Sequence, residues 1–136
     1  MLNSRSIDDL TPDARAWFYR FAAHAQEAGL TYIYDWIVTS TYRDQEQQDA
    51  LYAQGRTAPG PVVTWTRHSR HTGRRAWDVA IKTKDGKIDW NVAKADVDHD
   101  RIPDYQELAE VGRKMGLKVG ADYGDYPHFE TPEVVG

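Results

Sequence analysis

Residues 69–82 read "SRHTGRRAWDVAIK" and pass from a polar loop into a strand. The second half, "AWDVAIK", is rich in aromatic and β-branched side chains and predicts a strand. His71 and Asp78 lie seven positions apart across the junction. Because seven is odd and strand side chains alternate, the two cannot share a face of one regular strand. A loop that bends at Gly73 lets the imidazole and the carboxylate converge at the start of the strand.

One imidazole and one carboxylate are too few for catalytic zinc, which takes three protein ligands and an open position. The missing donor should come from a distant part of the chain, and "DYPHFE" near the C-terminus supplies His128. Asp125, three residues earlier, is available as a base that does not bind the metal. His68 lies so near His71 that spacing alone does not choose between them. The alternative is that these are surface or structural histidines and that Asp78 caps a turn.

The 136 residues are 40% hydrophobic, which predicts a single domain spanning residues 1–136. Five tryptophans, eight tyrosines and three phenylalanines favour a packed globule. The absence of cysteine excludes disulfides and thiolate metal sites. The net charge of -4 argues against a general binder of polyanions. The N-terminal residues lack the apolar segment of a secretory signal, and no run approaches the roughly 18 apolar residues of a membrane span.

The elements expected along the chain alternate between helices and short strands. Helix signals lie at residues 11–29, 43–55 and 104–115, with Gly29, Gly55 and Gly116 as their stops. Strand signals lie at residues 31–40, 61–63, 76–82, 88–90, 117–120 and 127–130, and "KDGK" predicts a turn after the strand at 76–82. This order predicts an α+β fold, a small antiparallel sheet with flanking helices.

"SRHTGRRAWDVA" followed by "GADYGDYPHFE" resembles the zinc D-Ala-D-Ala metallopeptidases and the phage L-alanyl-D-glutamate endopeptidases. Their pattern is S-x-H, six residues and D, then a distant acidic residue, two spacers and a histidine. Upstream, "TSTYRDQEQQDALYAQGRTAPGPVVTW" is similar to the Y-R, Q-x-x-LY and GR-T segments of the family. The resemblance covers roughly residues 35–131 in the order of the family. It implies the hedgehog/D-Ala-D-Ala-peptidase-like (LAS) fold.

Three positions depart from the pattern of the family. Arg74 stands where a glycine is usual, with Gly73 one step earlier. Tyr123 replaces the usual tryptophan, and Ala121 replaces a glycine. An aspartate at position 125 matches the phage endopeptidases better than the glutamate that is typical of the dipeptidases.

The resemblance implies one Zn²⁺ held by His71, Asp78 and His128, with Asp125 moving protons between the attacking water and the leaving amine. It also assigns Arg43 to substrate binding or to stabilising the tetrahedral intermediate, as suits a planar guanidinium. The alternative for Arg43 is a surface salt bridge with a neighbouring acid, Asp44 or Glu46.

Other side chains near the motif have two interpretations each. Ser69 would orient a metal ligand or contact substrate. Glu130 would orient the histidine two residues before it, or lie exposed on a strand. The arginines of the loop would form a solvated basic surface or attract the carboxylates of peptidoglycan stem peptides; they are Arg67, Arg70, Arg74 and Arg75. No stacking aromatic series accompanies them, so we expect no nucleic-acid partner.

"DVDHDRIPDYQE", residues 96–107, has the spacing of an EF-hand calcium loop. The ligand positions 1, 3, 5, 7, 9 and 12 fall on Asp96, Asp98, Asp100, the Ile102 carbonyl, Asp104 and Glu107. The glycine usual at position 6 is replaced by Arg101. In the alternative interpretation, Asp104 caps the following helix and forms a capping box with Glu107. A possible Ca²⁺ site therefore competes with an acidic loop and a helix cap.

Taken together, these features predict a zinc-dependent peptidoglycan endopeptidase of the phage endolysin type that hydrolyses the L-Ala–D-Glu bond of the stem peptide. The alternatives are a D-Ala-D-Ala carboxypeptidase and a non-catalytic peptidoglycan-binding module. We expect a monomer without a separate cell-wall-binding domain. Without a signal peptide it would accumulate in the host cytoplasm and reach the periplasmic cell wall after membrane permeabilisation.

Overall fold

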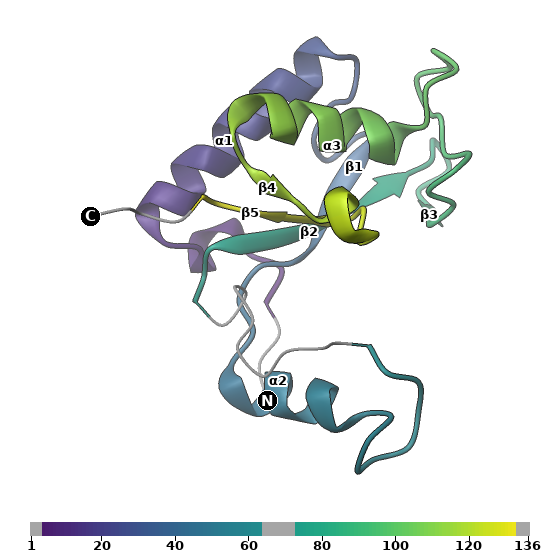
Figure 1. Ribbon diagram of the computed structural model, residues 1–136. Coiled ribbons are helices and arrows are strands. Elements are labelled where there is room, and N and C mark those ends of the chain that lie inside the picture. The colour runs from purple at the N-terminus through teal and green to yellow at the C-terminus, as the bar shows by residue number, and fades with distance from the viewer. Residues whose placement is uncertain (1–3, 64–72, 133–136) are drawn as a thin grey trace.

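The computed structural model describes residues 4–63 and 73–132, and it is drawn in Figure 1. Helices and strands follow one another in the α+β order that the sequence predicts. In chain order they are η1 (Ile7–Asp9), α1 (Pro12–Glu27), β1 (Trp36–Ser40), α2 (Gln45–Ala53), β2 (Ala76–Lys82), β3 (Ile88–Asp89), α3 (Asp104–Met115), β4 (Lys118–Val119), η2 (Gly120–Tyr123) and β5 (His128–Glu130).

The five strands form one antiparallel sheet in the order β1-β2-β5-β4, and β3 pairs with the end of β2. Strand β2 is central and pairs with both β1 and β5. Because β5 comes from the C-terminal end of the chain, its pairing with β2 joins segments about fifty residues apart: Asp78 lies opposite His128. This register carries the candidate site.

The hydrophobic core lies on the face of the sheet that α1 and α3 cover, whereas α2 stands apart on the other side in Figure 1. Alternate residues of β2 enter the core, where Trp77, Val79 and Ile81 are fully buried. Phe18 of α1 packs edge-to-face on Trp77, at 5.4 Å between ring centroids. Each such aromatic side chain contributes roughly 1.5–3 kcal/mol through burial. The packing leaves the opposite face of β2 and β5 available for polar side chains.

Most predicted elements are confirmed, and the helix boundaries follow the expected chemistry. Thr11 caps α1 by accepting a hydrogen bond from the Ala14 N–H at 3.3 Å. Asp44 caps α2 through the Gln47 N–H at 2.8 Å. Gly116 ends α3 in the left-handed conformation, with φ at 94°. Strand β2 has the predicted bounds.

One strand prediction is wrong, and another begins five residues too early. The strand expected over residues 31–40 begins only at Trp36, because Thr31 and Asp35 close a turn. The Thr31 N–H donates to the Asp35 carboxylate at 2.7 Å, and Ile33 takes a positive φ of 77°. The strand expected over residues 61–63 is absent, since these residues have no regular structure. Within the described ranges, no helix is both long and apolar enough to cross a membrane.

Candidate active site

Asp78 of β2 and His128 of β5 form the centre of the candidate site. They are paired across the two strands, and their side chains point to the same face of the sheet, where His128 Nδ1 lies 2.9 Å from Asp78 Oδ1. Their neighbours in sequence, Trp77 and Phe129, point into the core on the other face and are fully buried. The alternation of the strands thus anchors the pair firmly while leaving a quarter of the Asp78 side chain exposed (25%).

A tight loop before β5 brings Asp125 beside the pair. The Asp125 N–H donates to the Gly120 carbonyl at 2.7 Å, and the His128 N–H donates to the Asp125 carbonyl at 3.1 Å. Gly120 has no room for a side chain, because a Cβ there would overlap the Asp125 carbonyl oxygen and approach the Cβ of His128 to 2.7 Å. The loop therefore fixes the backbone that carries the predicted base three residues before the predicted ligand.

The second ring nitrogen of His128 faces another acid. His128 Nε2 lies 3.2 Å from Glu130 Oε1, and both side chains are only 12% exposed. Of the two interpretations of Glu130, the structure shows the contact with His128. Burial alone would lower the pKa of His128, but the hydrogen bonds to Asp78 and Glu130 and the charge of Asp125 outweigh it and raise that pKa to about 9.

Arg43 lies at the edge of the same face, after the end of β1. Its Nη1 donates to the Oε1 of Gln48 in α2 at 2.8 Å, and Gln48 is fully buried. Burial lowers the pKa of Arg43, and the negative charge of Asp78 opposes this shift. Among the described residues Arg43 makes no ion pair with Asp44 or Glu46, so the surface salt bridge is not the arrangement found.

Two residues near the site were given no role in the sequence analysis. Gln48 holds Arg43, and its only signal was its place in the Q-x-x-LY segment. Tyr123 lies 6.4 Å from His128 between ring centroids and is 63% exposed. Burial of its hydroxyl, then the charges of Glu130, Asp125 and Asp78, raise the pKa of Tyr123 to about 12. Its phenol thus stays protonated and able to donate beside the three carboxylates.

The loop that precedes β2 is tied to α1 and to the segment before α2. Arg74 takes a left-handed φ of 60°, the conformation that glycine favours, and its guanidinium stacks on Tyr42 at 3.9 Å. Arg75 makes two hydrogen bonds to Asp13, at 2.7 and 3.1 Å. These two arginines have structural partners. Ser69 and His71, and also His68, Arg67 and Arg70, lie outside the described residues.

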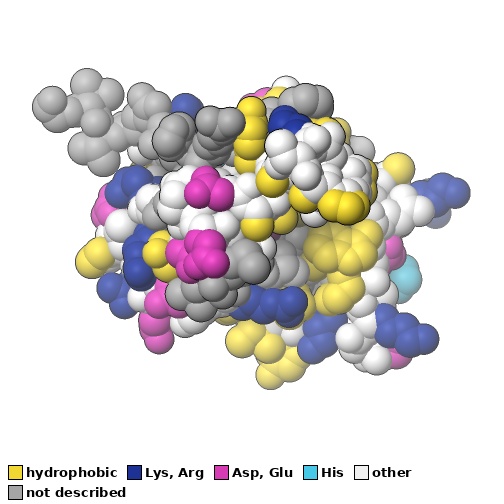
Figure 2. All heavy atoms as spheres, turned by 90° about the horizontal axis from the view of Figure 1, so that it is seen from below, with side chains coloured by type: hydrophobic (Ala, Val, Ile, Leu, Met, Phe, Trp, Pro, Cys, Tyr) yellow, Lys and Arg dark blue, Asp and Glu magenta, His cyan; other side chains and the backbone are white. Residues whose placement is uncertain are grey.

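Figure 2 views the molecule from the side of α2, and this face carries both acidic and basic side chains. Basic and acidic side chains lie interspersed with hydrophobic ones, and the coloured atoms form no continuous basic patch. Some large apolar side chains are exposed, among them the neighbours Ile33 and Tyr34 and the neighbours Val62 and Val63.

The described donors fit a zinc ion. An imidazole nitrogen and a carboxylate oxygen are ordinary zinc ligands, and here they lie 2.9 Å apart on rigid strands. Glu130 accepts from Nε2, which fixes the ring and leaves Nδ1 beside Asp78 as the donor atom. Zinc would displace the proton from Nδ1. The third predicted ligand, His71, falls in the segment that precedes Gly73.

The acidic loop after β3 is a separate cluster. Asp96, Asp98, Asp100 and Asp104 each place one carboxylate oxygen within 4.8 Å of the others. The predicted capping box is wrong: Pro103 is the N-cap of α3, which has no side-chain cap. The Asp104 carboxylate turns back and accepts from the Val97 N–H at 2.6 Å.

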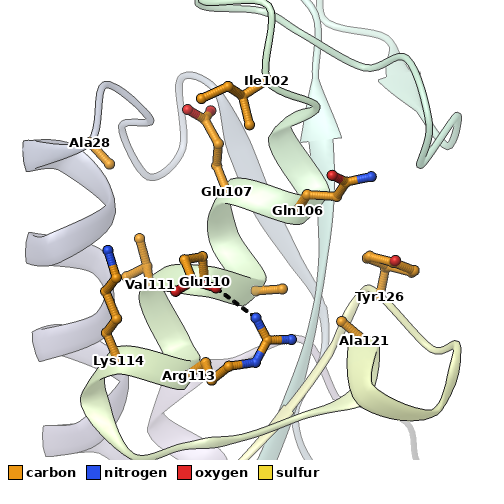
Figure 3. Close-up of a pocket in the computed structure, with 11 residues that line it drawn as sticks. Ala28, Ile102, Gln106, Glu107, Glu110, Val111, Arg113, Lys114, Ala121 and Tyr126 are labelled. Carbon is orange, nitrogen blue, oxygen red and sulfur yellow. Dashed lines mark hydrogen bonds and ion pairs between the residues drawn. The ribbon is translucent and has the colours of Figure 1, made fainter.

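A pocket of about 540 Å³ is lined mainly by side chains of α3 (Figure 3). It extends from Ile102 and Glu107 at one end to Tyr126 and Ala121 at the other. An ion pair between Glu110 and Arg113, at 2.7 Å, crosses its floor. Asp78, Asp125 and His128 do not line it, so this pocket and the site on the strands are separate features of the described structure.

Comparison with known proteins supports the resemblance. No model of a known protein family matches the chain. It is 37% identical over 101 residues to the peptidoglycan L-alanyl-D-glutamate endopeptidase CwlK of Bacillus subtilis (strain 168), an alignment that covers 71% of this chain and 60% of CwlK. The chain thus spans less than two thirds of the length of this relative.

Two solved structures share the fold. The L-Ala D-Glu endopeptidase ChiX of Serratia marcescens superimposes with a TM-score of 0.62 at 19% identity, covering 96% of this chain and 89% of ChiX. The LD-carboxypeptidase LdcB superimposes with a TM-score of 0.60 at 15% identity, covering 90% of this chain and 58% of that one. The chain therefore has the fold of these peptidases, and its sequence is similar to that of an L-alanyl-D-glutamate endopeptidase, in agreement with the resemblance of its motifs.

Proposed function

We propose that this chain is a zinc-dependent peptidoglycan endopeptidase that hydrolyses the L-Ala–D-Glu bond of the stem peptide. The observation that carries the proposal is the Asp78–His128 pair, held at 2.9 Å on adjacent strands with Asp125 in the loop that leads to it. The similarity to CwlK and ChiX, both named as L-Ala–D-Glu endopeptidases, supports the choice of bond.

His71, Asp78 and His128 would hold the zinc. A zinc ion with three protein ligands and an open position makes a water more acidic and polarises a carbonyl group. Glu130 keeps the imidazole of His128 in one orientation by accepting from Nε2. The tight turn at Gly120 and the buried neighbours of the pair hold both side chains in place before substrate arrives.

Side chains around the proposed zinc ligands would transfer the proton and stabilise the tetrahedral intermediate. The Asp125 carboxylate takes a proton from the attacking water and delivers it to the nitrogen of the leaving amine. The Arg43 guanidinium, held by Gln48, offers its remaining N–H groups to a substrate carboxylate or to the oxyanion of the tetrahedral intermediate. Tyr123 has a protonated phenol and can donate a hydrogen bond to the same intermediate. Ser69 would contact the substrate or orient a metal ligand.

Digestion of purified wall fragments tests the bond and the metal together. Zinc-loaded protein should release peptides with a new D-Glu amino terminus, identified by mass spectrometry, and a chelator should stop the reaction until zinc is restored. Loss of one terminal D-Ala instead would make the chain a carboxypeptidase, an activity class to which the structural relative LdcB belongs. Retention on peptidoglycan without any cleavage by zinc-loaded protein would make it a binding module.

We also propose a lytic role of the endolysin type. The chain would then act on the cell wall from the inside once the membrane is permeabilised, and as a monomer. Expression in a bacterial host should leave cells intact until a permeabilising agent is added, after which turbidity should fall. Turbidity that stays constant after permeabilisation, despite active purified enzyme, would contradict this role.

A further inference from the structure

The acidic loop of residues 96–103 and the first turn of α3 contain five carboxylates that turn toward one another. One oxygen from each of Asp96, Asp98, Asp100 and Asp104 lies within 4.8 Å of the others. Glu107 joins them from α3, because its carboxylate interacts with that of Asp100. In Figure 3 Glu107 points from α3 toward Ile102, away from Arg113. The residues that supply zinc ligands and base belong to other elements.

Three oxygens of this cluster are buried without a hydrogen-bond donor. They are Asp98 Oδ1, Asp104 Oδ1 and Glu107 Oε2. Asp104 is fully buried, and only its other oxygen is satisfied, by the Val97 N–H. Burying a carboxylate oxygen away from water without a donor is costly. Three such oxygens in one place indicate a missing positive partner.

The described residues, 4–63 and 73–132, supply no such partner. In the described part of the chain, no lysine, arginine or histidine makes an ion pair with any of these five acids. Burial, and then interactions with the neighbouring carboxylates, raise the pKa of Asp98 to about 7 and that of Glu107 to about 9. Mutual repulsion is therefore strong in the absence of a cation.

The backbone of the loop has the shape that the EF-hand spacing requires. Arg101, at the sixth position, where glycine is usual, takes a left-handed φ of 70°. The N–H groups of Asp100 and Arg101 donate to the Asp96 carboxylate at 3.2 and 2.9 Å. The turn is thus formed even though the glycine is absent, and it directs the alternate acids inward.

We propose that Asp96, Asp98, Asp100, Asp104 and Glu107, with the Ile102 carbonyl, bind one Ca²⁺. The donors are all oxygen and numerous, which suits a hard cation of six to eight ligands. Zinc favours nitrogen or sulfur donors in a set of four. Magnesium requires a rigid octahedron and keeps several waters, so a loop that offers up to six protein oxygens favours calcium.

The position of the loop gives the ion a structural role. Asp98 approaches the end of α1, because its carboxylate would lie 3.1 Å from a Cβ at Gly29. Tyr105, next to Asp104, is fully buried and links the sheet to α3: its hydroxyl donates to the Asp89 carbonyl at 2.6 Å and accepts from the Ile81 N–H at 3.1 Å. A cation in the loop would hold α1, β3 and the start of α3 together.

Calcium titration of zinc-loaded protein tests the proposal. Isothermal calorimetry should find one site with a Kd between about 10⁻⁶ and 10⁻³ M, and weaker binding of Mg²⁺. The unfolding midpoint should rise by about 5–10 °C at a hundredfold excess over Kd. Zinc content is measured before and after, so the result does not depend on peptidase activity and leaves the proposed function untouched if it fails.

Asp98→Asn separates a cation site from a structural acidic loop. The variant should lose Ca²⁺ binding at least tenfold, yet unfold at the same or a higher temperature than wild type in calcium-free buffer, since an amide relieves the repulsion. Glu110→Gln is the control: it also removes one negative charge, but from α3, one turn after Glu107. It should keep wild-type Ca²⁺ binding. Wild-type protein without binding or stabilisation at 10 mM Ca²⁺, or an Asp98→Asn variant that binds like wild type, would overturn the proposal.

Discussion

The sheet face around Asp78 and the loop around Asp98 both gather acidic side chains, but they neutralise them differently. On the sheet face, His128 lies between Asp78 and Glu130, and Arg43 stands within reach of the Asp78 charge. In the loop, acids face acids, and three of their oxygens have no donor. In the first arrangement the protein supplies the positive groups itself, whereas for the second we propose that a bound cation supplies the positive charge.

The two regions are also assembled by different means. Asp78 and His128 come from strands about fifty residues apart and meet only through the β2–β5 register. The acids of the loop lie within twelve consecutive residues, and their approach needs only a local turn. A mixed nitrogen and oxygen set suits zinc, and an all-oxygen set suits calcium. The chemistry and the means of assembly together predict that mutations in one region should leave the other intact.

The largest effect should come from removing the base. Asp125→Asn should lower kcat by about 10²–10⁴-fold while zinc stays bound, because an amide cannot take the proton of the attacking water. Asp98→Asn, the same substitution in the acidic loop, should leave kcat unchanged when calcium is in excess. Steady-state cleavage of a purified muropeptide and elemental analysis measure both. Zinc lost from Asp125→Asn would identify Asp125 as a ligand.

Glu130→Gln should weaken zinc binding by about 10–100-fold, because the partner that orients His128 loses its charge. Competition against a chelator of known affinity measures the change. Glu107→Gln, in α3, is the matched variant in the acidic cluster and should keep wild-type zinc affinity. Equal losses in the two variants would mean that both regions respond to a general change of charge.

Gln48→Met should lower kcat/KM by about tenfold, since the buried side chain would no longer accept from Arg43 Nη1. Zinc content and the unfolding midpoint are measured beside the kinetics. Gln26→Met, an exposed position on α1, is the control and should leave kcat/KM unchanged. A normal kcat/KM for Gln48→Met would remove Arg43 from the proposed machinery.

The smallest effect concerns a pair that belongs to neither region. Hydrogen bonds from Arg75, then Thr11, lower the pKa of Asp13 to about 2 from 3.8. A lowered pKa in the folded state contributes stability above pH 3.8, and this contribution is lost as the pH falls toward 2. Because the pair is partly exposed, Asp13→Asn should cost only about 0.2–1 kcal/mol at pH 7. Urea unfolding at pH 7 and at pH 2 should show a difference from wild type only at pH 7.

The sequence predicted helices and strands well where the local residues favoured only one type of secondary structure. The β-branched and aromatic run at 76–82 and the capped helix at 12–27 lie where expected. The first half of the strand predicted over 31–40 was wrong, because the Asp35 carboxylate stabilises a turn within a segment of strong strand preference. The capping box at Asp104 was wrong for a similar reason, since its carboxylate bonds to Val97 across the loop. In both cases the carboxylate accepts a hydrogen bond from a backbone N–H a few residues earlier in the chain.

The sequence by itself determined the kinds of donor: imidazole and carboxylate at family spacing for one metal, alternating carboxylates for another. Residue types and spacing indicated a possible zinc site, and the resemblance of the ordered motifs to a known family indicated a peptidase. Only the tertiary structure decided which atoms meet. The pairing of β2 with β5 sets Asp78 against His128, and packing alone shows that Gln48 holds Arg43 and that three loop oxygens lack a donor. Contacts between distant segments depend on register and burial, which the sequence does not display locally.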